Sequence, residues 1–165
     1  MKVLDHRTIC QKLKRLAIEI LENNYEEQEI LMVGINNSGM TLAKLIMAEL
    51  EQMKSTPKLA LANLRLNPAN PTGNEITIGI TQDEIKGKVI ILVDDVANTG
   101  RTLFYAFKPF LEVVPKRIET VVFVDRTHKS FPVNIDYYGL SLATTLKENI
   151  KVDLSNPDDL GVFLN

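Results

Sequence analysis

Residues 89–102 read VIILVDDVANTGRT, and this stretch decides the fold. Its first five residues are apolar, which is typical of a strand buried on both faces in a parallel sheet. Two acids, Asp94 and Asp95, follow this run, and a loop of small residues then leads to a helix that begins near Gly100. The unpaired N–H groups at a helix start favour a bound anion, so this order of elements predicts a phosphate site. The candidate phosphate loop consists of Val96, Ala97, Asn98, Thr99, Gly100, Arg101 and Thr102.

The two acids need a partner other than phosphate, because a carboxylate repels a phosphate placed beside it. A carboxylate accepts hydrogen bonds from the vicinal hydroxyls of a ribose, so Asp94 and Asp95 indicate a sugar next to the phosphate loop. The stretch lacks the lysine of a P-loop and the glycine spacing of a dinucleotide fingerprint, which argues against those two nucleotide sites. The alternative is purely structural: Asp95 caps a helix and Gly100 makes a turn.

Strands and helices alternate along the rest of the chain. Apolar periodicity predicts helices over 6–24, 41–53 and 102–114, and strands over 30–33, 59–66, 76–80, 88–93, 120–124 and 162–164. Pro109 is expected to kink the third helix. This alternation predicts an α/β fold with a mostly parallel sheet.

Ligands bind such sheets at the carboxyl ends of the strands, where we expect loops at 34–39, 94–101 and 125–130. Residues 67–74 are rich in Pro, Asn and Gly and are expected to form an exposed, mobile loop. These loops are where the sequence directs a search for chemistry.

Composition bounds the class of protein. The 165 residues fit one domain, and 19 Lys plus Arg against 21 Asp plus Glu give a net charge of −2, which excludes a wholly basic surface for nucleic acid. The single cysteine, Cys10, cannot form an intramolecular disulfide. The longest apolar runs are far too short for a membrane span, and the polar start is unlike a signal peptide. We therefore expect a cytoplasmic domain with no membrane partner.

The stretch 89–102 resembles the 5-phosphoribosyl 1-diphosphate (PRPP) motif of the type I phosphoribosyltransferases: an apolar strand, two acids, a short loop and Thr-Gly-x-Thr. The resemblance implies catalytic roles for Asp94 and Asp95, with one of them accepting a proton. Residues 31–43, LMVGINNSGMTLA, resemble the segment that holds the diphosphate in the same enzymes. The implied diphosphate loop is Ile35, Asn36, Asn37, Ser38 and Gly39. Its local alternative is an ordinary turn with Ser38 as a helix N-cap.

Residues 121–139, VVFVDRTHKSFPVNIDYYG, resemble the late region of the PyrR-like subfamily of uracil phosphoribosyltransferases and pyrimidine regulators. That likeness implies a single domain over 1–165 with a five-stranded parallel core at about 25–125. It also implies a hood from the N-terminal segment and about 125–165, a flexible loop at about 66–75, and a homodimer or larger assembly. The implied base or hood residues are Asp125, Arg126, His128, Tyr137 and Tyr138. Core packing is the alternative for one of the two tyrosines, and a solvated turn is the alternative for Arg126 and His128.

The implied reaction transfers phosphoribose from PRPP to a nucleobase, with uracil giving UMP and diphosphate. Mg²⁺ is expected as cofactor, held mainly by PRPP, with Asp94 or Asp95 as a candidate ligand. Three alternatives remain open: a purine base as acceptor, a nucleotide sensor without turnover, and an RNA-binding regulator that senses pyrimidine nucleotides. The last would use a basic cluster at the first helix, formed by Lys2, Arg7, Lys12, Lys14 and Arg15.

The chain departs from the PyrR-like pattern at two places. Ser38 stands where the diphosphate loop of that subfamily usually carries an arginine, and an arginine clamp binds a diphosphate more strongly than a serine does. Residues 64–68, Leu-Arg-Leu-Asn-Pro, replace a Tyr-Arg-Asp-Asp run. Both departures concern the leaving group and the flexible loop, and leave the phosphate loop intact.

Overall fold

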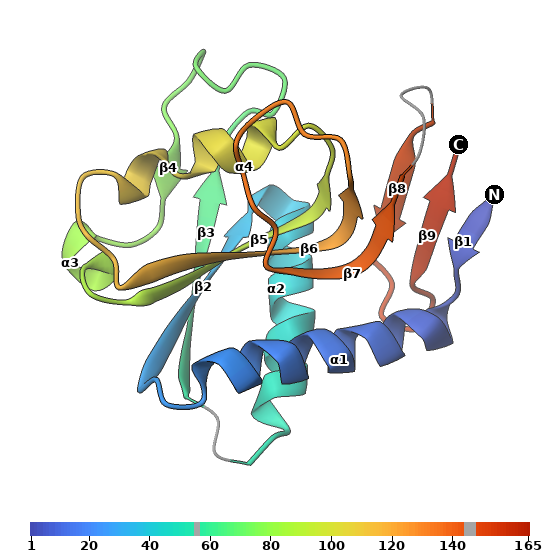
Figure 1. The fold of residues 1–165 in the computed structure, drawn as a ribbon, viewed down its shortest axis with the longest axis horizontal. Helices are drawn as coiled ribbons and strands as arrows, with labels where there is room; N and C mark the ends of the chain where they lie inside the picture. Colours follow the sequence, from blue (N-terminus) through green and yellow to red (C-terminus); the bar gives the residue numbers. More distant parts are fainter. Residues whose placement is uncertain (55–56, 144–147) are drawn as a thin grey trace.

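A six-stranded sheet forms the centre of the protein. The computed structural model describes residues 1–54, 57–143 and 148–165. The strand order is β4-β3-β2-β5-β6-β7, and all neighbouring pairs are parallel except β3 with β4 (Figure 1). The strands span β2 Glu29–Ile35, β3 Lys58–Arg65, β4 Thr77–Ile78, β5 Val89–Ala97, β6 Arg117–Arg126 and β7 Tyr137–Leu142. The predicted α/β fold with five parallel strands is confirmed.

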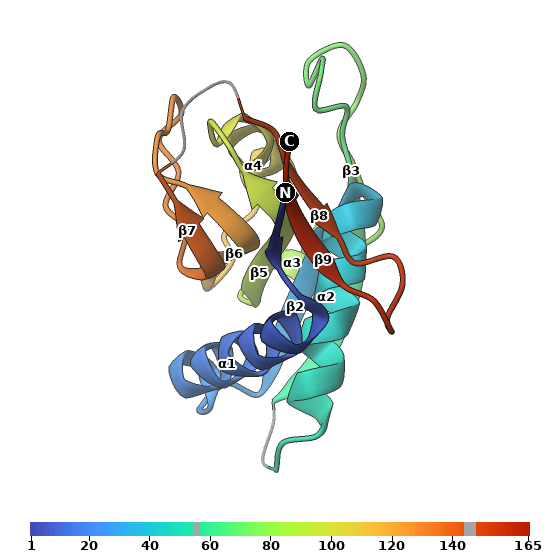
Figure 2. The same cartoon turned by 90° about the vertical axis from the view of Figure 1, so that its right-hand side faces the viewer.

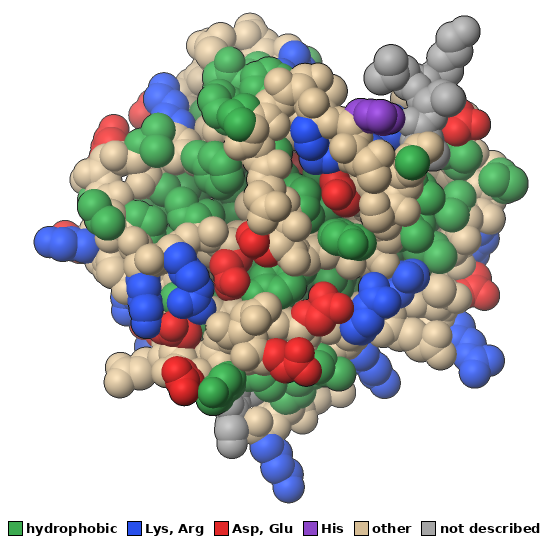
Figure 3. All heavy atoms as spheres, in the orientation of Figure 1, with side chains coloured by type: hydrophobic (Ala, Val, Ile, Leu, Met, Phe, Trp, Pro, Cys, Tyr) green, Lys and Arg blue, Asp and Glu red, His purple; other side chains and the backbone are tan. Residues whose placement is uncertain are grey.

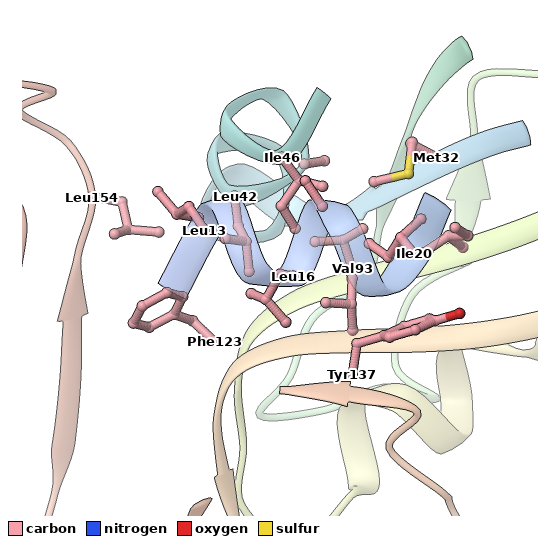
Figure 4. Packing of buried hydrophobic residues seen from close by; sticks show 14 of the residues in the cluster. Leu13, Leu16, Ile20, Met32, Leu42, Ile46, Val93, Phe123, Tyr137 and Leu154 are labelled. Carbon is pink, nitrogen blue, oxygen red and sulfur yellow. The ribbon is translucent and has the colours of Figure 1, made fainter. Parts of the chain in front are cut away.

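Helices cover both faces of this sheet. On one face, α1 His6–Asn24 and α2 Asn36–Glu51 pack over β2, β5 and β6 through an apolar cluster that includes Leu16, Ile46 and Phe123 (Figure 4). On the other face lie α3 Gln82–Ile85, α4 Arg101–Ala106 and a 3₁₀ turn at Lys108–Phe110, whose buried residues include Leu103 and Phe110. The central strands are therefore buried on both sides, which explains their continuous apolar runs.

A second sheet joins the two ends of the chain. Its order is β1-β9-β8, with β1 Lys2–Leu4, β8 Ile150–Asp153 and β9 Gly161–Leu164, and both pairs are antiparallel. The termini lie side by side, and the Leu164 N–H donates to the Met1 carbonyl over 2.8 Å (Figure 2). We call β1, β8 and β9 the terminal sheet. Only its β9 strand was expected from the sequence.

Three predicted boundaries are wrong near the strand ends. Strand β5 continues to Ala97 instead of ending before Asp94, and α2 begins at Asn36, so 34–39 is no loop. The third helix is not a kinked helix over 102–114: α4 ends at Ala106 and a 3₁₀ turn contains Pro109. Proline disfavours helical geometry at the residue before it and lacks a donor, which stops the helix instead of bending it.

The segment 67–74 lies outside regular structure and is almost entirely exposed, as predicted. It connects β3 to β4, and β4 returns antiparallel with Leu64 opposite Ile78. No helix in the described parts of the chain is long and apolar enough to cross a membrane. Of the expected hood region 125–165, residues 144–147 lie outside the described residues.

Candidate functional site

A cavity of about 520 Å³ opens where β5 passes into α4. Asp94 lies on its wall, and the connection between the two elements supplies most of the rest. The lining residues are Pro68, Asp94, Val96, Ala97, Asn98, Thr99, Gly100, Arg101, Thr102, Leu103, Ser130 and Phe131. All seven residues of the predicted phosphate loop therefore face one cavity, which we call the loop cavity.

Gly100 fixes the shape of the phosphate loop. It is the N-cap of α4 and has a φ of 85°, a conformation that favours glycine. A Cβ at this position would lie 2.4 Å from Cγ2 of Val133, so a side chain has no space there. The Thr99 carbonyl accepts N–H donors from Ser130 (2.9 Å) and Phe131 (3.2 Å). Residues 130–133 thus pack against the phosphate loop and hold it by hydrogen bonds.

Asp94 is the buried acid of the site, with 7 % of its surface exposed. Its Oδ1 accepts the N–H of Asp95 over 2.9 Å. Burial raises the pKa of the Asp94 carboxyl well above its ordinary value, and the neighbouring charge of Asp95 raises it further. A carboxylate whose conjugate acid has a raised pKa accepts a proton more readily than an ordinary aspartate does, which suits a general base.

Asp95 faces a different cavity from Asp94. Because β5 remains a strand through the acid pair, successive side chains point to opposite faces of the sheet. The second cavity, of about 360 Å³, is lined by Asn37, Ser38, Thr41, Asp95 and residues 151–155. We call it the diphosphate cavity, after the segment that the sequence assigned to that group. Two acids expected to act as one pair therefore stand between two cavities.

The expected diphosphate segment 35–39 is the junction of β2 and α2. Asn36 has a φ of 52°, in the left-handed region that non-glycine residues rarely adopt. Its Oδ1 accepts the Leu66 N–H (3.1 Å), and its carbonyl accepts the Asn63 side-chain amide (3.1 Å). The N-cap of α2 is Ile35 and makes no side-chain bond, so Ser38 is not an N-cap. Ser38 lies instead in the first turn and lines the diphosphate cavity.

Gly39 brings this first turn against β5. A Cβ at Gly39 would lie 2.3 Å from the Val93 carbonyl oxygen and 3.4 Å from the Asp94 Cα. Only a residue without a side chain allows α2 to approach the strand this closely. The contact fixes the distance between the diphosphate segment and the two acids.

The end of β6 lies beside the phosphate loop, with Asp125 opposite Ala97, but neither Asp125 nor Arg126 lines either cavity. The Lys129 ammonium lies 2.6 Å from the Asp125 carboxylate. The Arg126 guanidinium donates to the Glu148 carbonyl (2.6 Å) and to the Asn98 side-chain oxygen (3.4 Å). His128 is exposed and lines neither cavity. Asp125 and Arg126 are therefore held near the phosphate loop, whereas His128 is not brought to it.

The two tyrosines of β7 lie away from both cavities. Tyr137 is buried against α1 (Figure 4), its hydroxyl donating to Glu119 (2.8 Å) and accepting from Asn23 (3.1 Å). Tyr138 is 44 % exposed. Tyr137 is thus the tyrosine that packs in the core, which was the alternative given for one of the two from the sequence. Neither tyrosine lines the loop cavity or the diphosphate cavity, so neither ring is placed to stack on a ligand there.

Several lining residues were missed from the sequence. Arg101 Nη2 donates to the Pro68 carbonyl over 2.6 Å, which ties the exposed 67–74 segment to the phosphate loop. Ser130, Phe131 and residues 151–155 are brought in by the topology of the chain. Local sequence patterns do not indicate such contacts. The predicted loop at 125–130, at the end of a strand, did lie close to Ser130 and Phe131.

Three comparisons place this geometry among known proteins. The model of the family described as "Phosphoribosyl transferase domain" matches residues 2–154. The "Bifunctional protein PyrR" of Macrococcus caseolyticus is 31% identical, covering 95% of this chain and 93% of its own. The "Pyrimidine operon regulatory protein" of Lactococcus lactis is 34% identical, covering 95% and 91%. A solved hypoxanthine-guanine phosphoribosyltransferase of Bacillus anthracis superposes with a TM-score of 0.77 at 18% identity, covering 99% and 96%.

Proposed function

This chain belongs to the phosphoribosyl transferase family, and we propose that it transfers phosphoribose from PRPP to uracil, releasing diphosphate and UMP. The observation that carries the proposal is the loop cavity, where the complete phosphate loop and the buried Asp94 share one wall. The type I fold agrees with it, because the sheet presents these residues at the carboxyl end of a central strand. The choice of uracil as the acceptor rests on a relative whose name refers to pyrimidines.

We assign the 5-phosphate of PRPP to the phosphate loop. Gly100 adopts its left-handed conformation at the N-terminus of α4, where the first backbone N–H groups lack carbonyl partners within the helix and can donate to an anion. The hydroxyls of Thr99 and Thr102 add donors. Tethering the phosphate there places the sugar over the strand end, beside Asp94.

The sugar carbon that reacts becomes positively charged as diphosphate leaves, as in glycoside cleavage. Asp94 and Asp95 supply negative charge next to this carbon, and either carboxylate accepts hydrogen bonds from ribose hydroxyls. The raised pKa of Asp94 suits it to take the proton that the base nitrogen loses. We therefore assign proton transfer to Asp94 and ribose contact to both acids.

We assign the leaving diphosphate to the diphosphate cavity. Mg²⁺ in this family is a partner of PRPP, and it keeps several water and substrate oxygens as ligands. The described residues contain no cluster of three or more His, Cys, Asp or Glu side chains that could hold a metal ion. The Asp95 carboxylate, which lines the cavity, fits a single protein ligand. When bound, the metal supplies positive charge to the departing diphosphate.

Pro68 of the 67–74 segment lines the loop cavity, and β8 of the terminal sheet lines the diphosphate cavity. We propose that the terminal sheet and the 67–74 segment limit the access of water to the site. The terminal sheet would be the hood of the fold, and the 67–74 segment its flexible loop. Arg101 already connects that segment to the phosphate loop. Asp125 and Arg126, which lie beside the phosphate loop, are our candidates for contact with the base, whereas the position of Tyr137 in the core argues against stacking by that residue. We further propose a homodimer or larger assembly for the protein.

An RNA-binding regulator is the second candidate function, favoured by the printed name of the Lactococcus relative. The basic cluster at α1 is partly engaged within the chain, because Lys12 Nζ (2.9 Å) and Arg15 Nη2 (3.2 Å) both donate to the Gly139 carbonyl. Acidic and basic side chains are interspersed over the face shown in Figure 3. A mixed surface weakens phosphate binding along an RNA, so the enzyme remains our first proposal.

The proposal is tested by incubating the protein with PRPP, Mg²⁺ and, separately, uracil, hypoxanthine, guanine, xanthine and adenine. Chromatography identifies the nucleotide formed. UMP as the main product supports the proposal. A purine nucleotide as the main product would show that a purine base, and not uracil, is the acceptor. If PRPP binds and no base reacts, the chain is a sensor. A salt-dependent gel shift with a pyrimidine leader RNA would support the regulator.

A further inference from the structure

The diphosphate cavity contains a cation that the sequence did not suggest. Among the described residues that line it, Lys151 of β8 is the only one with a positive charge. Its side chain is 64% exposed, and its Nζ lies 3.3 Å from Asp153 Oδ2. Strand β8 passes beside the end of α2 that carries Ser38 (Figure 2).

The first turn of α2 offers no charge of its own to a diphosphate. Asn37, Ser38 and Thr41 line the cavity with neutral side chains, and Ser38 stands where an arginine is usual in the PyrR-like pattern. The carboxylates of Asp95 and Asp153 also line this cavity. Both repel a multiply charged anion, so among the described side chains that line the cavity only the Lys151 ammonium attracts the anion by its charge.

We propose that Lys151 is the diphosphate-binding cation of this protein and replaces, from the terminal sheet, the arginine absent at Ser38. The inference rests on the proposed function. Lysine carries its charge on a flexible stem with three donors, so it can leave Asp153 for a diphosphate oxygen without movement of the backbone. Asp153 keeps hydrogen bonds from the Ser155 hydroxyl (2.6 Å) and N–H (3.2 Å) when the lysine leaves.

The test measures the affinity of inorganic diphosphate with Mg²⁺ and, separately, of UMP by calorimetry. Lys151→Met should weaken diphosphate binding by about tenfold or more, as expected for a lost charge-assisted hydrogen bond. It should leave the affinity for UMP unchanged, because UMP has no diphosphate. Lys151→Arg should restore most of the loss. The matched control is Lys2→Met, which removes a lysine of the same sheet whose partner is Asp159, outside the cavity.

Asp153→Asn separates direct contact from a structural role. If Lys151 only holds Asp153 in place, Asp153→Asn weakens diphosphate binding as much as Lys151→Met does, and the proposal is overturned. If Lys151 binds the anion, Asp153→Asn keeps or improves that affinity, since it frees the ammonium and removes a negative charge. Equal diphosphate affinities for Lys151→Met and Lys2→Met would also overturn it.

The same titrations distinguish this inference from the proposed function. Wild-type protein that binds neither UMP nor diphosphate contradicts the function itself, and the assignment of Lys151 with it. Wild-type protein that binds both, combined with a Lys151→Met variant that binds diphosphate normally, refutes only the role of Lys151.

Discussion

Replacing Gly39 with alanine tests whether the site depends on the close approach of α2 to β5. The added Cβ would lie 2.3 Å from the Val93 carbonyl oxygen and 3.3 Å from its carbon. Carbon and oxygen atoms normally approach to about 3.3 Å. Both obstructing atoms belong to the backbone of a central strand, so the first turn of α2 must move outward by about 1 Å.

This displacement separates the diphosphate segment from Asp94 and Asp95. A misplacement of about 1 Å between reacting groups costs about 10²-fold in rate. Overpacking typically destabilises a fold by about 1–3 kcal/mol, while the better helix propensity of alanine returns about 1 kcal/mol. We therefore expect Gly39→Ala to remain folded, with a modestly lower melting temperature and about a hundredfold lower kcat.

The assay compares initial rates of UMP formation and thermal unfolding for Gly39→Ala and for the control Gly79→Ala. A Cβ at Gly79 would meet its nearest atom, the Asn63 carbonyl oxygen, at 4.0 Å, which is an ordinary contact. The control should behave as wild type in kcat. If Gly39→Ala keeps its rate within about threefold, the reasoning that this contact sets the active geometry is refuted.

Three further variants test the roles of individual side chains. Asp94→Asn should raise the melting temperature at neutral pH, because the pKa of Asp94 is higher in the folded than in the unfolded state and the wild type therefore loses stability as the pH rises from 3.8 through the raised pKa. Below pH 3.8 the melting curves of the variant and the wild type should show no such difference. A gain in melting temperature that persists below pH 3.8 would contradict this explanation. Tyr137→Phe should cost about 1–3 kcal/mol in chemical denaturation, because Glu119 loses a buried donor, with the KM for uracil unchanged; a raised KM would instead indicate contact with the base. Arg101→Met should speed proteolytic cleavage within 67–74, since it removes the bond to the Pro68 carbonyl, and cleavage at the wild-type rate would refute that tie.

The central sheet was predictable because its strands are buried on both faces. The strands predicted at 30–33, 88–93 and 120–124 each correspond to a strand of the structure, and each observed strand extends further at its carboxyl end. The predicted strand ends were wrong where polar residues continue a strand beyond its apolar run. Asp94 and Asp95 read as the start of a loop, yet β5 continues to Ala97 in parallel pairing with β6.

That error changed the interpretation of the site. A loop would allow both acids to reach a sugar from one side, whereas a strand directs their side chains to opposite faces, so Asp94 and Asp95 can reach a sugar placed between the two cavities only from opposite sides. The junction at Asn36 was missed for a related reason: a left-handed residue, held by hydrogen bonds from Leu66 and Asn63, connects strand and helix without a loop. Such long-range hydrogen bonds leave no periodic trace in the sequence.

The grouping of residues 96–102 around one cavity was predictable because these residues form a contiguous segment between a strand and a helix. Lys151 was not predictable, because only the pairing of β8 with β9 and the packing of the terminal sheet bring it beside Ser38. The role of Tyr137 likewise depended on a partner across the sheet, Glu119, that local sequence does not indicate.

We expect cleavage of PRPP at this site to depend on the acid pair at the end of β5. The most direct measurement is the rate of diphosphate release from PRPP and uracil, with Mg²⁺, by the wild type and by a variant that carries both Asp94→Asn and Asp95→Asn. We predict release by the wild type and none by the double variant, with an unchanged circular dichroism spectrum. Undiminished release by the folded double variant would contradict the account.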